Sequence, residues 1–273
     1  MPALMLLSKT VRMMSPSLSS DDQIAIAEAR THRPRWHRWS DETRPTDVEA
    51  AYLLQQKIHD ALEEAGIRRV GYKIASIAIE GQRALGLTEP AYAGMYDLTH
   101  MKTLREALAL PLIAPSVECE IAFITSAELR ADRDLSDAAL CAAIGSAHLA
   151  CEVVDNRYGK PLEVGIPTIL TDDFFHSAFV LHTPRPDWQD VIGDDIPGTI
   201  EIDGKIVHGN TADALRPLEA LRWLVQKLGS HGLTLGAGEI VLAGSLVKPT
   251  PVSLPATSVT IAAEGFGALT LAD

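Results

Sequence analysis

The sequence predicts an α+β fold, with a mostly β core, several helices and a helical N-terminal region. From about residue 67 onward, short β-like runs alternate with Gly and Pro punctuation, as is typical of strands joined by turns. The region before it contains an amphipathic helical pattern instead. Strands and helices do not alternate strictly, which argues against a doubly wound sheet. We therefore expect a helical N-terminal region over 1–66 and a larger domain over 67–273.

Two helices are expected in the N-terminal region. The first covers "DDQIAIAEARTH" and ends before Pro34, after which a loop rich in Arg, Pro and Trp follows. Thr46 and Glu49 form a capping-box pattern at the start of "TDVEAAYLLQQKIHDALEEAG", and Gly66 stands at its expected end. The apolar face of this second helix repeats every three or four residues, at Val48, Ala51, Leu54, Ile58, Ala61 and Leu62.

The following segments predict the β core. "RRVGYKIASIAI" is a strand, "EGQRALGLTEPAY" is helical or looped, and "SVECEIAFIT" is a strand. A helix over "DLSDAALCAAIGS" and a strand over "HLACEVVD" come next. "TIEIDGKIVHGN" predicts a hairpin that turns at Asp203 and Gly204. Pro217 begins a helix over "RPLEALRWLVQKLGSHG", and "EIVLAGSLV" and "SVTIAAEGFGALTLA" are the last strands.

The composition excludes some classes of partner. Of the 273 residues, 47% are apolar and 22% are charged, which is ordinary for a globular protein. The net charge is −12 and no long basic run occurs, so nucleic acid is not expected as the main partner. Neither a secretory signal nor a segment long enough to span a bilayer is recognised. Three cysteines without a CxxC pair fit a reducing compartment, and we expect a cytoplasmic protein.

Two acidic residues interrupt the apolar strand "PSVECEIAFIT". Glu118 and Glu120 point to one face of it because strand side chains alternate. Two carboxylates on one face repel each other unless a cation, a proton or water offsets their charge. Since most acidic residues are solvated, a half-exposed strand with its acids in water is the better explanation of this pair on spacing alone.

Glu152 adds a third carboxylate. It lies in the apolar run "HLACEVVDN", where an uncompensated acid is costly. Three carboxylates that converge from two strands would form an oxygen-only site for Mg²⁺ or Mn²⁺. Zinc would prefer His and Cys ligands, which this arrangement lacks.

Lys73, Ser245 and three histidines are further candidates for chemical roles. Lys73, in the apolar strand "VGYKIAS", is either an edge lysine that reaches solvent or a partner of the anionic site. "GAGEIVLAGS" lacks the pattern of a nucleotide-binding loop, and Ser245 lacks a nucleophile elbow. His148, His176 and His208 are interpreted as structural, because no metal-binding histidine motif surrounds them.

In order and spacing, several segments resemble the 2-keto-4-pentenoate hydratase / 4-oxalocrotonate decarboxylase family of the fumarylacetoacetate hydrolase-like superfamily. The resemblance extends from about residue 46 to the C-terminus. It is carried by "GYKIA", "LGLTEPAYAGMYD", "PSVECEIAFIT", "ACEVVDNRY", "PLEALRWLVQKLGSHG" and "GAGEIVLAGSLVKPTPV". It implies a mixed β-sheet barrel-like roll of the fumarylacetoacetate hydrolase C-terminal type, with flanking helices, as a catalytic domain over 67–273.

The resemblance also assigns site residues. It places metal-binding glutamates at Glu118, Glu120 and Glu152, with Mg²⁺ or Mn²⁺ as the cofactor. It gives catalytic roles to Lys73 and Glu120. Residues expected to bind the substrate are Lys73, Asp172, Ser245 and Lys248, the last as a partner for a distal carboxylate.

The chain departs from the family pattern near the pocket. "ASIAI" replaces a polar segment after the lysine, and "TDDFFHS" replaces an "ADNxS"-like segment. Arg216 stands before Pro217, where many members have a small residue. These changes bear on the identity of the substrate more than on metal binding.

The leading hypothesis is a hydratase of 2-hydroxy-2,4-dienoates in aromatic catabolism, which yields a 4-hydroxy-2-oxoacid. The alternatives are decarboxylation of a 2-oxo diacid, hydrolysis of an acylpyruvate, and a non-catalytic metal-binding scaffold. Hydrolysis would need a water-activating His/Glu pair, which the N-terminal third does not show. We expect a small-molecule substrate, a homo-oligomer, and association with a partner enzyme of the pathway as a further option. Neither nucleic acid nor a membrane is expected as a partner.

Overall fold

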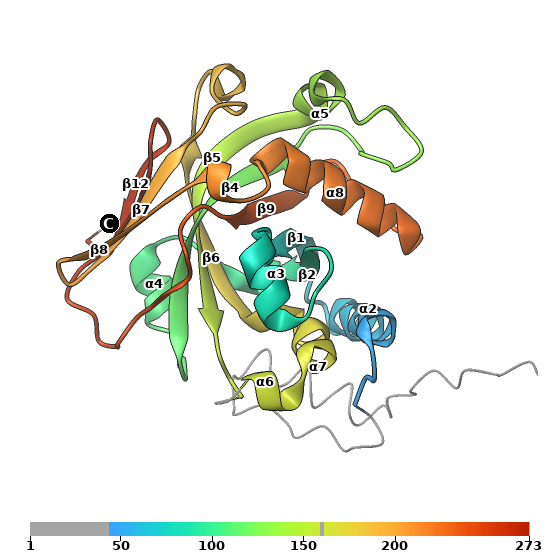
Figure 1. The fold of residues 1–273 in the computed structure, drawn as a ribbon, viewed down its shortest axis with the longest axis horizontal. Coiled ribbons are helices and arrows are strands. Elements are labelled where there is room, and N and C mark those ends of the chain that lie inside the picture. Colours follow the sequence, from blue (N-terminus) through green and yellow to red (C-terminus); the bar gives the residue numbers. More distant parts are fainter. Residues whose placement is uncertain (1–43, 159–160, 273) are drawn as a thin grey trace, which may run out of the picture.

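The computed structural model describes residues 44–158 and 161–272. The helix predicted over 21–32 and most of the loop after it lie outside these residues. The described chain forms a curved sheet of eight strands, against which a sheet of four strands and several helices pack (Figure 1). This architecture confirms the predicted α+β class.

The larger sheet is mixed. Its order is β2-β1-β9-β4-β5-β6-β3, and β10 pairs with β4. The pairs β1/β9 and β3/β6 are parallel, and the other pairs are antiparallel. The strands are β1 Arg69–Ala75, β2 Ala91–Tyr96, β3 His100–Met101, β4 Pro115–Thr125, β5 Ile144–Asp155, β6 His176–Pro184, β9 Ile240–Ser245 and β10 Thr250–Pro251.

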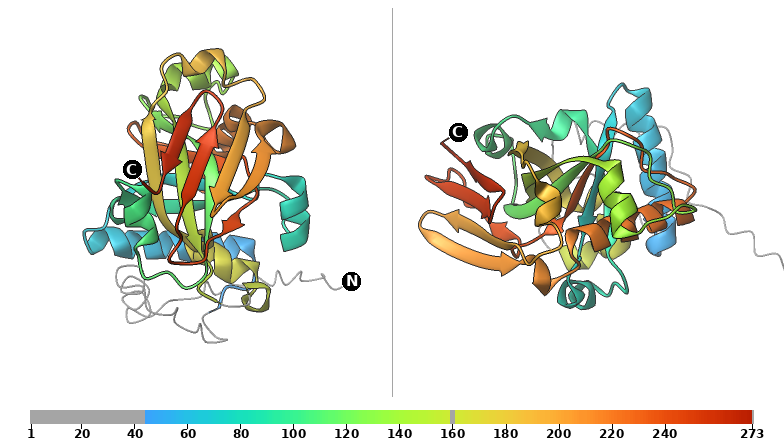
Figure 2. Two further views of the ribbon diagram at one scale, coloured as in Figure 1. Left: turned by 90° about the vertical axis from the view of Figure 1, so that its left-hand side faces the viewer. Right: turned by 90° about the horizontal axis from the view of Figure 1, so that it is seen from above.

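The smaller sheet is antiparallel, in the order β12-β11-β7-β8. Its strands are β7 Pro197–Ile202, β8 Lys205–Asn210, β11 Val259–Ala263 and β12 Gly267–Thr270. Asp203 and Gly204 form the predicted hairpin turn, both with positive φ, which confirms that prediction. The sheet packs against β4 and β5, and Figure 2 shows it on the opposite side of the molecule from α2.

Helices pack around the larger sheet, with α8 against β9, and α2 packs against α7. The helices are α2 Val48–Glu64, α3 Ile79–Leu85, α4 Leu104–Leu108, α5 Asp137–Ala143, α6 Pro161–Val164, α7 Ile166–Thr171 and α8 Pro217–Ser230. Short 3₁₀ turns are η1 Asp97–Thr99, η2 Asp173–Phe175, η3 Trp188–Asp190 and η4 Thr211–Asp213.

The start of α2 corrects one prediction. Asp47, not Thr46, is the N-cap, because its carboxylate accepts a hydrogen bond from Ala50 N at 2.9 Å. Thr46 instead donates its hydroxyl to Asp47 Oδ2. At the other end the prediction is confirmed, since Gly66 follows the helix with φ +84°.

Four strands of the larger sheet escape prediction from the sequence: β2, β6 and the two-residue strands β3 and β10. All six residues of β2 are buried, and so are the first five of β6. A strand buried on both faces has no alternation of polar and apolar residues, which is the main signal for a strand. The division at residue 66 stays a prediction; in the structure the Gln55 side chain of α2 donates to Leu170 O of α7.

The two faces of β4 pack into two different apolar clusters. Val117, Cys119 and Ile121 are fully buried and belong to a cluster that includes Ile200 and Ile261 of the smaller sheet. The opposite, inner face carries a second apolar cluster of Met95, Ala122, Ala150, Phe179, Ile240 and Leu242. Glu118 and Glu120 share this inner face with Ala122 because strand residues alternate. Both acids therefore face the inside of the curved sheet, where Glu120 is buried and Glu118 is half-buried.

Candidate metal centre and active site

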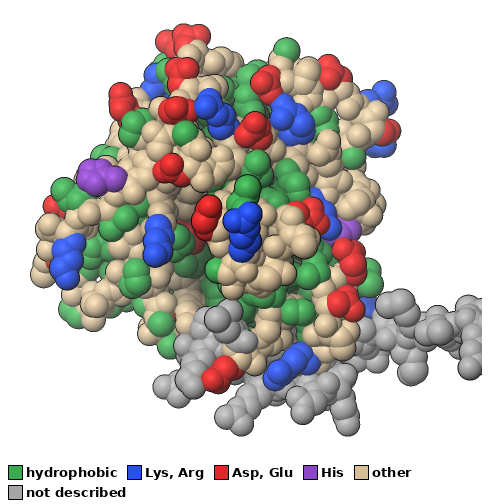
Figure 3. All heavy atoms as spheres, in the orientation of Figure 1, with side chains coloured by type: hydrophobic (Ala, Val, Ile, Leu, Met, Phe, Trp, Pro, Cys, Tyr) green, Lys and Arg blue, Asp and Glu red, His purple; other side chains and the backbone are tan. Residues whose placement is uncertain are grey.

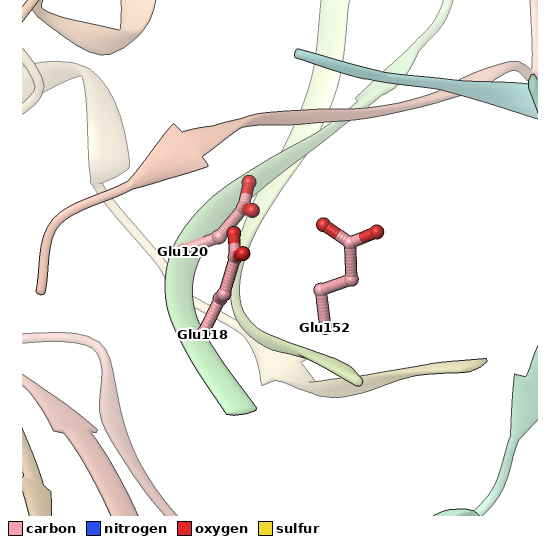
Figure 4. Close-up of side chains that lie close together, drawn as sticks. All are labelled: Glu118, Glu120 and Glu152. Carbon is pink, nitrogen blue, oxygen red and sulfur yellow. The ribbon is translucent and has the colours of Figure 1, made fainter. Parts of the chain in front are cut away.

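Glu118, Glu120 and Glu152 meet on the inner face of the larger sheet. In the antiparallel pair of β4 and β5, Glu118 lies opposite Glu152, and Glu120 lies opposite Ala150. The three carboxylates face a common space (Figure 4). One oxygen from each lies within 4.8 Å of the others, which is close to the spacing of oxygen ligands around one divalent cation. Their convergence agrees with the prediction, and their role as ligands stays a prediction.

The hydrogen bonds of two of these glutamates leave one oxygen each for a further ligand. Glu120 Oε2 accepts a hydrogen bond from Gly244 N at 2.8 Å, whereas Glu120 Oε1 is buried without a hydrogen-bond partner among the described residues. Glu152 Oε1 lies 2.7 Å from His176 Nδ1 and 3.3 Å from Lys73 Nζ, whereas Glu152 Oε2 has no such partner. A buried carboxylate oxygen is costly to leave unpaired. The donor set therefore fits a hard divalent cation.

The electrostatics of the three acids agree with this fit. Burial and the charge of Glu152 raise the pKa of Glu118 to about 7, although part of its side chain reaches solvent. Burial, Glu152 and Glu118 raise the pKa of Glu120 well above its ordinary value. Burial opposes ionisation of Glu152 as well, but Lys73 and His176 outweigh it and lower the pKa of this carboxyl. A dication at this point would favour the ionised form of all three.

Lys73 lies in the same enclosed region, as predicted. Its side chain is 1% exposed, so it does not reach solvent as an edge lysine would. Nζ donates to Phe174 O at 3.1 Å and lies 3.3 Å from Glu152 Oε1. Burial alone would lower the pKa of Lys73, but Glu152, Glu118 and Glu120 outweigh it and raise this pKa. Lys73 is therefore a buried ammonium that touches a candidate metal ligand.

His176, interpreted from the sequence as structural, lies beside the candidate metal ligands. Its Nδ1 faces Glu152 Oε1, and its Nε2 lies 3.0 Å from Thr99 Oγ1. The ring is buried, and burial lowers the pKa of His176. A histidine at the start of β6 gave no signal because its partner comes from β5, 24 residues earlier in the chain.

Similarity to known proteins agrees with this geometry. No family model matches the chain. It is 32% identical to the TodF product hydratase of Pseudomonas putida, covering 76% of this chain and 78% of the relative. It is 30% identical to the 2-keto-4-pentenoate hydratase of Paraburkholderia phymatum, covering 82% and 85%. The chain belongs to the 2-keto-4-pentenoate hydratase family.

A solved structure shares the fold of this hydratase-family protein. It is the 4-oxalocrotonate decarboxylase of Pseudomonas putida G7 complexed with magnesium and adipate, which matches with a TM-score of 0.80 at 22% identity. The match covers 93% of this chain and 98% of the decarboxylase. The roll of fumarylacetoacetate hydrolase type that the resemblance implied is thereby confirmed.

Three other predicted site residues of this hydratase-family chain lie as follows. Asp172 is buried and accepts hydrogen bonds from Arg157 Nε and Nη2 and from the Tyr158 hydroxyl. Ser245 lies opposite Glu120 in the sheet and donates its hydroxyl to Val247 O at 2.5 Å. Lys248 is exposed, three residues after Ser245. Roles for all three in substrate binding stay predictions.

One residue of the segment that replaces the family's polar residues, Ile77, is buried beside the candidate site. Ile77 packs against Gly244, whose N–H holds Glu120. A Cβ at position 244 would lie 2.6 Å from the Ile77 side chain, and φ is +94° there, so glycine is required. The centre of the Phe174 ring lies 5.3 Å from Lys73 Nζ. The candidate site thus combines charged groups with apolar neighbours.

Among the described residues, the face of the molecule in Figure 3 has no strongly charged area that would indicate a further binding site. Figure 3 shows acidic, basic and hydrophobic side chains mixed over the face that it draws, without a large area of one charge. Within 44–158 and 161–272, no helix has the length and the apolar character that crossing a membrane requires.

Proposed function

We propose that this protein is a divalent-cation-dependent hydratase that adds water to a 2-hydroxy-2,4-dienoate and releases a 4-hydroxy-2-oxoacid. The observation that carries the proposal is the pair of buried, unpartnered oxygens of Glu120 and Glu152 beside the ammonium of Lys73. The 2-keto-4-pentenoate hydratase of Paraburkholderia phymatum, at 30% identity, supports the reaction class.

Glu118, Glu120 and Glu152 would hold the cation, and Mg²⁺ or Mn²⁺ suits ligands that are all oxygens. When bound, the ion supplies positive charge that polarises the carboxylate and the 2-oxygen of the substrate. Gly244 N and His176 Nδ1 each hold one carboxylate oxygen, so two of the three ligands are oriented before the ion binds.

Lys73 moves the proton in this proposal. An ammonium has three N–H bonds, and the contacts with Phe174 O and Glu152 Oε1 use two of them within the described part of the chain. The third is available to the substrate. Lys73 passes this proton to the conjugated chain and recovers one from the enol oxygen, so the amine ends in its starting state. Water then adds to the polarised double bond.

The apolar neighbours of the charged groups favour a substrate without a second carboxylate. Ile77 packs against Gly244, which binds Glu120, and Phe174 lies beside Lys73, so an unpaired distal carboxylate next to them would lose its hydration. This is the observation that favours hydration of a monoacid over decarboxylation of a diacid. Lys248, exposed beyond Ser245, is the residue that would reverse this preference if it folds over the substrate.

A paired assay tests the proposal. One protein preparation is assayed with Mg²⁺ and then with EDTA, and ultraviolet absorbance follows the loss of 2-hydroxypenta-2,4-dienoate. CO₂ release from 2-oxohex-3-enedioate is measured in parallel. Loss of the dienol that needs Mg²⁺ and occurs without CO₂ supports the hydratase. CO₂ from the diacid alone would show a decarboxylase, and silence in both assays with Mg²⁺ bound would show a non-catalytic relative. We also propose that the protein is cytoplasmic, forms a homo-oligomer and associates with a partner enzyme. This assay does not test these three points.

A further inference from the structure

The segment that leads into β6 has an unusual backbone. Asp173, Phe174 and Phe175 have φ values of +47°, +49° and +68°, and none of them is glycine. Three consecutive left-handed residues with side chains are rare because each Cβ crowds its own backbone. Such a turn persists only where its surroundings hold it, and strain of this kind concentrates at functional sites.

Asp173 holds the turn in place. Its carboxylate is fully buried and accepts hydrogen bonds from three groups: His59 Nε2 at 2.8 Å, Gly94 N at 2.9 Å and the Tyr96 hydroxyl at 3.1 Å. These groups come from α2 and β2, far from the turn in sequence. The anchor therefore fixes the turn to the sheet that carries Lys73.

The turn and the residue that follows it make two contacts with the candidate site. The carbonyl oxygen of Phe174 accepts a hydrogen bond from Lys73 Nζ at 3.1 Å. Directly after the turn, His176 places Nδ1 2.7 Å from Glu152 Oε1. Thr99 Oγ1, 3.0 Å from the other ring nitrogen, fixes the orientation of the imidazole. Both Lys73 and Glu152 are thus held by one short segment.

We propose that His176 is a positioning residue, which holds one oxygen of Glu152 so that the other faces the cation. Lys73 contacts the same Glu152 oxygen at the longer distance of 3.3 Å, so without His176 the ammonium would be the only group among the described residues that orients this carboxylate. Glu152 could then turn both oxygens toward Lys73 and away from the cation. Partners that orient a metal ligand typically change metal affinity by about 10–100-fold when they are removed.

Two amide substitutions separate positioning from simple packing. The amide nitrogen of Asn can occupy the place of His Nδ1, whereas that of Gln reaches the place of Nε2. His176→Asn therefore keeps the hydrogen bond to Glu152, and His176→Gln keeps only the contact with Thr99. A role in packing alone would affect His176→Asn at least as much as His176→Gln, because Asn is the smaller side chain and leaves the larger cavity.

The measurement is Mg²⁺ affinity by isothermal titration calorimetry on EDTA-stripped full-length protein. We expect His176→Gln to weaken binding by about 10–100-fold, and His176→Asn to stay within about threefold of the wild type. Equal affinities of Asn and Gln variants, whether both normal or both weak, would overturn the proposal. If His176→Gln does not fold, Thr99→Val replaces it. That variant removes the support of the ring and should weaken Mg²⁺ binding by about 3–10-fold, and unchanged affinity would overturn the proposal.

The inference rests on the proposed metal site, but its test does not depend on turnover. A wild-type protein that binds Mg²⁺ without hydrating any dienoate would contradict the proposed function and leave the role of His176 intact. Active wild-type enzyme with equal Mg²⁺ affinities in the Asn and Gln variants would contradict the role of His176 alone.

Discussion

The two faces of the β4 and β5 pair differ in what their side chains contact, although both depend on the same strand register. On the face toward the smaller sheet, Cys119 lies opposite Cys151, and both are enclosed by apolar neighbours. On the inner face, Glu118 lies opposite Glu152, and two carboxylate oxygens of the acidic group have no hydrogen-bond partner in the described chain. One face is satisfied by packing, whereas the other leaves these two oxygens open to a further ligand. Substitutions on the two faces should therefore alter different measurements.

Removing charge on the inner face should have the largest effect. Glu120→Gln is expected to lower both Mg²⁺ affinity and turnover by about 10³-fold or more, because the charge stabilisation from a bound ion is worth several kcal/mol. Without Mg²⁺ the same variant should unfold at an equal or higher temperature, since one of three mutually repelling acids is gone. Calorimetric titration, steady-state kinetics and thermal unfolding give the three readings. A variant with normal affinity and normal turnover would show that Glu120 holds no ion.

Lys73→Met should separate turnover from metal binding. Turnover should fall by about 10²–10⁴-fold, the usual contribution of a positioned proton donor. Mg²⁺ affinity should not fall, because removing the ammonium leaves the acidic group more negative. The comparison of kinetics with calorimetry decides the point, and a folded variant with full turnover would exclude Lys73 from proton transfer.

A substitution on the opposite face of β4 serves as the matched contrast. Ile121 is fully buried in the cluster toward the smaller sheet, so Ile121→Ala should lower the free energy of unfolding by about 2–5 kcal/mol. Mg²⁺ affinity of the folded protein should stay unchanged. Urea denaturation and calorimetry measure the two quantities. A large loss of affinity would show that the two faces are coupled through the strand and would blur the distinction drawn between them.

The smallest predicted effect is on pH dependence. The pKa of Glu118 is raised to about 7 in the folded chain, above its value in an unfolded chain. The unfolded chain therefore releases this proton first, and metal-free protein should lose stability as the pH rises from about 4.5 to about 7. Thermal unfolding in EDTA, compared with Glu118→Gln, measures this contribution. An identical pH profile in the variant would contradict the assignment.

Much of the fold could be predicted from local sequence signals. The hairpin at Asp203 and Gly204 and the helix that begins at Pro217 depend on residues a few positions apart, and both are present. The predicted N-cap residue of α2 was wrong. Thr46 and Asp47 are both good N-caps, and only the backbone geometry selects between them. The fully buried β2 has no alternation and could not be recognised.

Some residues of the candidate site could likewise be predicted from the sequence, and others could not. Glu118 and Glu120 could be found because acids in an apolar strand are conspicuous, and Glu152 and Lys73 stand out for the same reason. His176 could not be found, because its partner lies on another strand and the turn before it follows no local rule. The pairing of Asp172 with Arg157 was equally invisible as a contact.

The sequence by itself determined the strand alternation that puts two acids on one face, the helix and turn signals, and the family to which the chain belongs. These features depend on the period of the side chains and on the intrinsic preferences of the residues, which are local properties. Only the tertiary structure decided which oxygens are left unpartnered, which turn holds Lys73 and Glu152, and which histidine orients a carboxylate. Those outcomes depend on the pairing of strands that are distant in the chain, because hydrogen-bond satisfaction is settled only when the buried partners meet.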